Sequence, residues 1–183
     1  MFRINKKTKL DKKTLIIILY IIYKLNGILG KTHLQKLLFL LNIRTFKRFK
    51  KPIVDLQFDK YKYGPFSYQV DEYIDHLENK KLINSKELIY NKEKKYIRYY
   101  CSENLPNIKE LLLENIEPRE TMVLDEVIES YGSVSLRDLL DIVYQLPLVK
   151  NAKYCQPLEV AEKIEDEEKN YYDNFEEFEK LLK

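Results

Sequence analysis

The segment "YKYGPFSYQV", residues 61–70, places a glycine and a proline side by side between two patterned stretches. Gly64 accepts positive φ, and Pro65 fixes its own φ at about −65° while disfavouring helix in the residue before it. Upstream, "VDLQFDKYKY" alternates apolar and polar residues, which favours a short strand or an extended connection. The pair therefore predicts a turn, after which Ser67 is suited to be the N-cap of a helix.

Apolar residues at helical spacing lie on both sides of this turn. After it, residues 68–83 carry Val70, Ile74 and Leu77 with Tyr73 beside them. Before it, residues 31–46 have the spacing i, i+3, i+4, i+7 in leucines 34, 37, 38 and 41. Both patterns predict helices, the earlier one with one face in a core.

The N-terminal region has features that fit either a targeting signal or a buried helix. Five lysines among residues 6–13 precede "LIIILYIIY", which has the charge and length of a signal-peptide core. However, "KLNGILG" offers no small-x-small cleavage site, and nine apolar residues are too few to cross a bilayer, which needs about twenty. We therefore expect a buried helix behind Asp11 as N-cap, no membrane association, and a cytoplasmic protein.

The region after the third predicted helix has the pattern of a hairpin. Two alternating runs, residues 83–90 and 96–101, flank the polar tip "NKEKK". Three helices followed by a hairpin are the order of a winged helix-turn-helix. The predicted fold class is therefore mainly α with a small β-hairpin, with a winged-helix domain over residues 11–104 and additional C-terminal helices.

Residues 105–150 are predicted to be a helical extension packed on that domain. Pro118 is a good first-turn residue, and Gly132 ends the apolar stripe that follows it. Ser135 and Asp138 resemble a capping box before an amphipathic helix that stops ahead of Pro147. Residues 151–183 are predicted to be an acidic C-terminal helix, which either lies on the domain or forms a homodimer.

Charge divides the chain into two parts. Residues 1–116 hold 24 Lys and Arg against 12 Asp and Glu, which gives +12, whereas residues 117–183 hold 8 against 17, which gives −9 and the total of +3. Such a split indicates a polyanionic partner for the basic part. Cys101 and Cys155 lie far apart with no CxxC, so neither a disulfide framework nor a zinc site is favoured.

Two basic groups are candidates for holding DNA phosphates. "RTFKRFKK" at residues 44–51 interleaves cations with Phe46 and Phe49, and the hairpin adds a second group. At the start of the third helix two polar residues could read base edges. The candidate nucleic-acid-binding residues are Arg44, Lys47, Arg48, Lys50, Lys51, Tyr68, Gln69, Lys92, Lys94, Lys95 and Arg98. Four carboxylates on the same helix, Asp71, Glu72, Asp75 and Glu78, argue against the conventional mode because phosphates repel them.

Three stretches carry a resemblance to a known family. "LQKLLFLLN", "FDKYKYGPFSYQVDEYIDHLENKKLI" and "SLRDLLDIVYQLP" resemble the small prokaryotic winged-helix proteins of the YwgA-like and Panacea type. The resemblance covers about residues 31–85 well and 133–147 loosely. It implies a winged-helix fold without catalytic residues, and it implies either neutralisation of a protein toxin, as in Panacea antitoxins, or DNA binding.

Two functions therefore remain open. The preferred hypothesis is a winged-helix transcriptional regulator that grips double-stranded DNA with its basic clusters and acts as a dimer. The alternative is a protein-binding module of antitoxin or adaptor type, whose partner would be a toxin-like or basic protein; the acidic third helix and the acidic C-terminal region support it. We expect no enzyme activity and no cofactor, because the chain has no GxSxG, no HExxH and, with 4 glycines, no phosphate-binding glycine loop.

Overall fold

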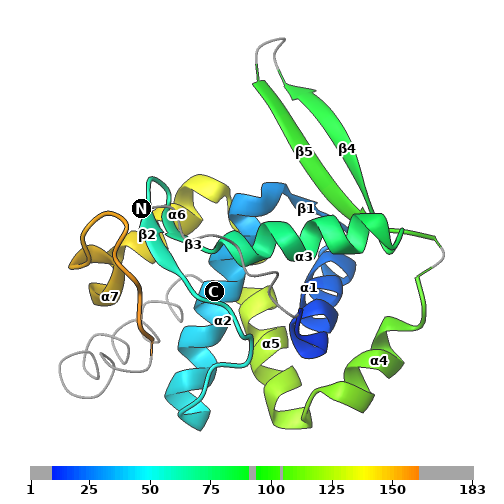
Figure 1. Ribbon diagram of the computed structural model, residues 1–183, viewed down its shortest axis with the longest axis horizontal. Helices are drawn as coiled ribbons and strands as arrows, with labels where there is room; N and C mark the ends of the chain where they lie inside the picture. Colours follow the sequence, from blue (N-terminus) through cyan, green and yellow to red (C-terminus); the bar gives the residue numbers. More distant parts are fainter. Residues whose placement is uncertain (1–9, 91–93, 104, 161–183) are drawn as a thin grey trace.

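The computed structural model describes residues 10–90, 94–103 and 105–160. Most of the ordered elements in these ranges are helices, and the strands form small antiparallel sheets (Figure 1). In chain order the elements are α1 (Lys12–Lys24), β1 (Ile28–Leu29), α2 (Gly30–Phe49), β2 (Asp59–Tyr61), β3 (Gly64–Phe66), α3 (Tyr68–Asn79), β4 (Ile83–Tyr90), β5 (Lys94–Cys101), α4 (Ile108–Asn115), α5 (Pro118–Tyr131), α6 (Leu136–Gln145) and α7 (Pro147–Lys150). The mainly α prediction is confirmed at this level.

Helix α2 is the centre of the core. Its residues from Leu34 to Ile43 are all buried, polar ones included, and it contacts α3, α5, α6, β3 and β5. The sequence predicted one core-facing stripe for this helix, but between His33 and Ile43 α2 is buried around its whole circumference, because neighbours pack on every side. Helix α1 packs against α4 and β5 and buries most of its apolar run as well.

Within residues 10–90, 94–103 and 105–160, two antiparallel sheets join the helices. The larger has the strand order β1-β5-β4, with β4 and β5 paired from Ile83↔Cys101 to Tyr90↔Lys94 and β1 paired to the base of β5. This confirms the predicted hairpin. The smaller sheet is the β2–β3 hairpin, paired from Asp59↔Phe66 to Tyr61↔Gly64.

The glycine and proline pair does not form the chain reversal itself. Gly64 has the expected positive φ of 76°, yet Gly64 and Pro65 belong to strand β3, and the reversal lies one step earlier at Lys62 and Tyr63. Helix α3 does begin after Ser67, as predicted. The Ser67 hydroxyl is buried and makes no capping hydrogen bond.

Several predicted helix ends are confirmed. The Thr14 backbone N–H donates to the Asp11 carboxylate at 2.7 Å, and the Asp138 N–H donates to the Ser135 hydroxyl at 3.2 Å. Pro118 opens α5 and Gly132 is its C-cap. The division into domains stays a prediction.

The C-terminal region differs from the predicted helix where it is described. Residues 151–160 are not helical, and they bridge to β2 through Asp59 and Pro157. The remainder of the predicted acidic helix and dimerisation element, residues 161–183, lies outside the described residues. Among the helices of the described ranges, none is long and apolar enough to cross a membrane.

Candidate functional site

Two polar side chains of α2 hold the segment that follows the β2–β3 reversal. The Lys36 ammonium, with a side chain only 1% exposed, donates to the Pro65 carbonyl at 2.8 Å, and the Gln35 amide donates to the Ser67 carbonyl at 3.4 Å. Burial lowers the pKa of Lys36 to about 8. These contacts explain physically why a polar pair in a buried helix accompanies the Gly-Pro segment: its backbone carbonyls need buried donors.

The opposite side of the same hairpin is held by the C-terminal part of the described chain. Tyr144 of α6 donates its hydroxyl to the Lys62 carbonyl at 2.9 Å. Residues 155–158 run along β2, where backbone bonds of 2.7 to 2.9 Å join Cys155 and Gln156 to Lys60, and Leu158 to Phe58. The β2–β3 hairpin is thus fixed on both sides by groups distant in sequence.

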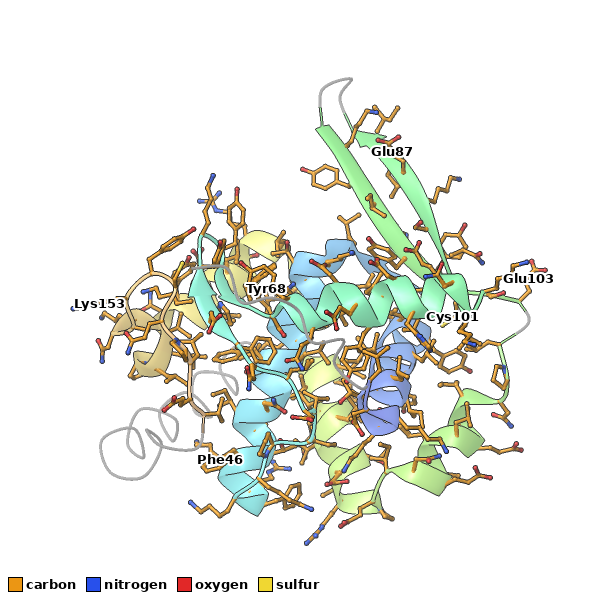
Figure 2. The ribbon with its side chains drawn as sticks, in the orientation of Figure 1. Phe46, Tyr68, Glu87, Cys101, Glu103 and Lys153 are labelled. Carbon is orange, nitrogen blue, oxygen red and sulfur yellow. The ribbon has the colours of Figure 1, made fainter. Side chains whose placement is uncertain are left out.

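This framework presents a cluster of aromatic rings at the surface. We define the aromatic cluster as Tyr61, Phe66, Tyr68 and Tyr154. Ring centroids lie 4.8 Å apart for Phe66 and Tyr68, 5.0 Å for Tyr61 and Tyr154, and 5.4 Å for Tyr61 and Phe66. Tyr68 is 57% exposed and Tyr154 63% exposed, so the rings pack on one another while facing solvent. Figure 2 shows Tyr68 where α3 begins.

The cluster also has a polar component. The Tyr68 hydroxyl donates to the Tyr61 hydroxyl at 3.2 Å, and this hydrogen bond raises the pKa of Tyr68 to about 12. Exposed Tyr63 continues the aromatic surface at the hairpin tip, with the Lys62 ammonium 5.4 Å from its ring centroid. Tyr68 therefore stays neutral at physiological pH, and the tyrosines offer both apolar area and hydroxyl groups.

The rim of the aromatic cluster carries both signs of charge. Lys62 and Lys153 are exposed next to Tyr61 and Tyr154 in sequence. On the other side, Asp71 and Glu72 follow Tyr68 by one helical turn. Asp71 is bound by the Lys31 ammonium at 3.1 Å. An apolar centre with a mixed polar rim is the usual composition of a protein-binding surface.

The predicted phosphate-binding cluster of residues 44–51 lies at the C-terminal end of α2, and carboxylates of α5 lie beside it. Arg48 makes a two-point ion pair with Glu126 at 2.8 and 2.9 Å. Lys51 lies 3.7 Å from Glu120 and 3.9 Å from Glu117. Arg44 donates to the Tyr131 hydroxyl at 3.2 Å, Lys50 is the left-handed C-cap of α2, and Lys47 is half-buried.

The other predicted nucleic-acid-binding residues are distributed over two further places. In the long hairpin, Lys95 pairs with Glu87 at 3.0 Å and Arg98 donates to the Asn26 carbonyl at 2.8 Å. Lys94 is the first residue of β5, and Lys92 lies outside the described residues. Tyr68 belongs to the aromatic cluster, while the Gln69 side chain accepts from the Gln57 backbone N–H at 2.8 Å. The structure therefore does not bring the predicted residues that it describes to one surface.

Sequence reasoning missed most of the aromatic cluster. Tyr61 and Phe66 stand in the quoted segment, and the density of aromatic residues there was an available signal. Tyr154 carried no such signal, because its place depends on the pairing of residues 155–158 with β2. Lys36 was also missed, since a lysine within an apolar helix is ordinarily expected on the solvent side.

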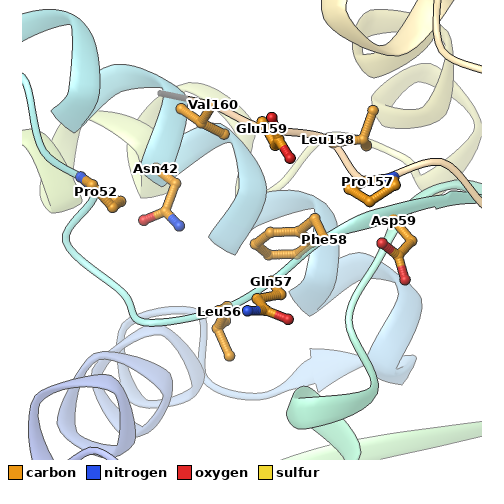
Figure 3. Close-up of a pocket in the computed structure, with 10 residues that line it drawn as sticks. All are labelled: Asn42, Pro52, Leu56, Gln57, Phe58, Asp59, Pro157, Leu158, Glu159 and Val160. Atoms are coloured by element: carbon orange, nitrogen blue, oxygen red, sulfur yellow. The ribbon is translucent and has the colours of Figure 1, made fainter. Parts of the chain in front are cut away.

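A groove lies beside the segment that pairs with β2 (Figure 3). It has a volume of about 470 Å³ and runs between residues 52–59 and 157–160. Asn42, at one end, is already bonded to Val54 through both its amide group and its oxygen, each at 3.0 Å. In the described part of the chain, no set of three or more His, Cys, Asp or Glu side chains is arranged to hold a metal ion.

A comparison with protein families gives a match over most of this architecture. The family model described as antitoxin SocA-like, Panacea domain, matches residues 34–148, which is more than half of the chain. The matched region runs from α2 into α7, and it includes Tyr61, Phe66 and Tyr68 but not Tyr154. No curated protein matches the chain, and no solved structure matches it. The Panacea part of the resemblance is thus confirmed, and the chain belongs to the family of antitoxin SocA-like Panacea domains.

Proposed function

We propose that this protein is a non-enzymatic, antitoxin-type binding module that neutralises a protein partner by occupying it, and that the aromatic cluster is the partner-binding surface. The observation that carries the proposal is the exposed ring assembly of Tyr61, Phe66, Tyr68 and Tyr154, most of which lies in the region that matches an antitoxin family. We therefore prefer the antitoxin-type function, which was the alternative predicted from the sequence, to DNA-binding transcriptional regulation.

Tyrosine-rich surfaces are well suited to bind proteins. Tyr and Trp are enriched among the residues that dominate binding energy, because each provides large apolar area and a polar group at low cost in side-chain entropy. Here the rings are already packed, and the backbone beneath them is held by Lys36 and Tyr144. A surface ordered before binding loses little further freedom, which favours affinity.

The mixed charge of the rim supports a protein rather than a nucleic acid. Asp71 and Glu72 lie one turn along α3 from Tyr68, where a phosphate backbone would meet them. Arg48 and Lys51, which the sequence analysis assigned to phosphates, are within ion-pair distance of α5 carboxylates. Their positive charge is thus partly compensated within the protein itself.

Duplex DNA binding by a winged-helix scaffold is the second candidate. It is supported by the helix order, by the pairing of β1 with β5, and by the basic residues of the β4–β5 hairpin. Anisotropy of a labelled mixed-sequence duplex across a salt series tests it, because phosphate contacts make affinity fall steeply with salt. We expect no salt-dependent binding at micromolar protein, and sedimentation of the same samples tests the predicted homodimer.

The partner-binding proposal is tested by site-specific photo-crosslinking in the native host. Benzoylphenylalanine replaces Tyr68 in one full-length variant and exposed Met122 of α5 in a matched control. We expect one discrete protein to be crosslinked from position 68 and not from position 122. Purified, that protein should bind the wild type, and its toxicity should be relieved by co-expression of the wild type.

Affinity measurements then separate surface contacts from misfolding. Tyr68→Ala and Tyr154→Ala should each weaken binding of the purified partner by tenfold or more, while Leu113→Ala, at an exposed position of α4, should leave it unchanged. Circular dichroism controls for folding. Equal crosslinking from both positions, or unchanged affinity in both tyrosine variants, would reject the aromatic cluster as the partner-binding surface.

A further inference from the structure

The β4–β5 hairpin is a second surface whose construction differs from that of the aromatic cluster. Its eight-residue strands project away from the helical body, and β1 pairs with β5 only near the base, at Tyr99 and Arg98 (Figure 1). Within the described residues, the strand order β1-β5-β4 leaves the outer edge of β4 without a partner strand. That edge presents a row of backbone donors and acceptors to solvent.

The outer half of the hairpin exposes apolar side chains on both faces. Residues directly opposite one another share a face, so Ile97 lies on the same face as buried Ile83 and Tyr99 but beyond the body that covers them. Ile97 is 47% exposed and Ile89, further along the same face, is 67% exposed. On the other face Leu88 pairs with exposed Tyr96.

The edge of β4 lacks most of the features that protect free edges from pairing. It contains no proline and no bulge, and its ladder with β5 continues without interruption from Ile83 to Tyr90. One lysine, Lys86, lies in its centre, next to Glu87, whose carboxylate is bound by Lys95 on β5 (Figure 2 labels Glu87). A long and regular edge of this kind is suited to accept another strand.

The charge of the hairpin indicates the chemistry of that strand. The two strands together carry four basic residues, Lys86, Lys94, Lys95 and Arg98, against the single carboxylate of Glu87. A cationic strand pair with apolar side chains on both faces complements a segment in which acidic and apolar residues alternate. The aliphatic side chains argue against a duplex, since phosphates would leave Ile89 and Ile97 exposed.

From these observations we propose that the free edge of β4 binds an extended acidic segment of a partner protein, which adds to the sheet as a fourth strand. This site is independent of the aromatic cluster, because the two surfaces share no residues. Backbone hydrogen bonds to β4 supply the pairing, and the cations and exposed isoleucines select acidic and apolar side chains.

The test uses the full-length protein and a displayed library of random twelve-residue peptides. Selection on the wild type, with removal of peptides that also bind the Lys86→Glu, Ile89→Lys double variant, should enrich sequences that alternate acidic and apolar residues. A synthetic peptide of the enriched sequence should bind the wild type at least tenfold more tightly than the double variant. It should also slow hydrogen exchange of backbone amides in residues 83–90.

Two control variants test whether the loss of peptide binding is specific to β4. Leu113→Lys on α4 should bind the peptide like the wild type, which excludes a general effect of added charge. Tyr68→Ala should also bind normally, so failure of the aromatic proposal does not affect this one. Enrichment of basic peptides, absence of enrichment, slowed exchange at residues 61–68 instead of β4, or displacement of the peptide by a 20-base-pair duplex would each overturn the proposal.

Discussion

The two hairpins in the described part of the chain present exposed surfaces by opposite means. The short one, β2–β3, has three residues per strand and is held from outside by Lys36 of α2, Tyr144 of α6 and the backbone of residues 155–158. The long one, β4–β5, has eight residues per strand and is held mainly by its own ladder, with β1 at the base.

This difference determines which substitutions change each surface. Changes in buried positions far from the aromatic cluster should alter it, because its backbone conformation depends on donors in other helices. Changes along the long hairpin should stay local, because few contacts connect its outer half to the core. Substitutions at the supports of the two hairpins test that contrast, and the largest effect is expected behind the short hairpin.

The largest effect concerns the buried lysine behind the short hairpin. Because burial lowers the pKa of Lys36 from 10.5 to about 8, the folded protein releases this proton at lower pH than the unfolded chain. Stability therefore rises with pH between about 8 and 10.5, by up to about 3 kcal/mol for this group. Lys36→Met, which lacks the titrating group, should lose that rise.

Urea denaturation of wild type and Lys36→Met at pH 7, 9 and 10.5 measures this contribution as a difference, which cancels the other titrating groups. Lys153→Met, at an exposed position, is the matched control and should follow the wild type. Hydrogen exchange should also be faster at residues 61–68 in Lys36→Met, and unchanged at 83–90. Parallel pH profiles for wild type and Lys36→Met would show that burial does not lower the pKa of Lys36.

A buried ion pair away from both hairpins provides a comparison. Its loss should lower the free energy of unfolding without changing either exposed surface. Glu120 is almost fully buried and is bound by the Lys13 ammonium at 2.7 Å, which joins α5 to the start of α1. Burial acts to raise the pKa of Glu120, but the hydrogen bond and charge of Lys13 outweigh it and lower the pKa. Glu120→Gln should therefore destabilise the protein by about 2 kcal/mol at pH 7.

That loss has a defined pH dependence. A depressed carboxyl pKa gives stability that is present above the unfolded value of 4.5 and is lost as pH falls through the folded value. The difference between wild type and Glu120→Gln should thus shrink below about pH 4.5. Exchange at residues 61–68 should be no faster than the global loss explains, in contrast to Lys36→Met; a selective increase there would weaken the assignment of Lys36 as the specific support.

The contrast between the hairpins also explains which features the sequence predicted. The long hairpin, the helix starting after Ser67 and the caps at Asp11 and Ser135 depend on local periodicity and local hydrogen bonds, and all are confirmed in position. The short hairpin was not predicted, because its support from Lys36 comes from 29 residues away. The same reason applies to residues 44–51, whose carboxylate partners in α5 follow them by more than 60 positions.

A smaller effect is expected on the other side of the short hairpin. Tyr144→Phe removes one hydrogen bond to the Lys62 carbonyl, which remains accessible to water. The cost should be about 0.5 to 1 kcal/mol, measured by urea denaturation. Because the hairpin also pairs with residues 155–158, binding of the crosslinked partner should fall less than in Tyr68→Ala. An equal fall would mean that Tyr144 is as important for the surface as the rings themselves.

The smallest effect is predicted in the long hairpin, and the same strand pair provides its control. Ile97→Thr replaces a half-exposed side chain by another β-branched one, so stability should change by less than about 0.5 kcal/mol. Ile83→Thr, on the same face but buried at the base, should cost about 2 kcal/mol because it places a hydroxyl in the core. Thermal denaturation compares the two. A large loss for Ile97→Thr would mean that a covering contact already protects this face in the free protein, and the free edge of β4 would then have to be reconsidered as a docking site.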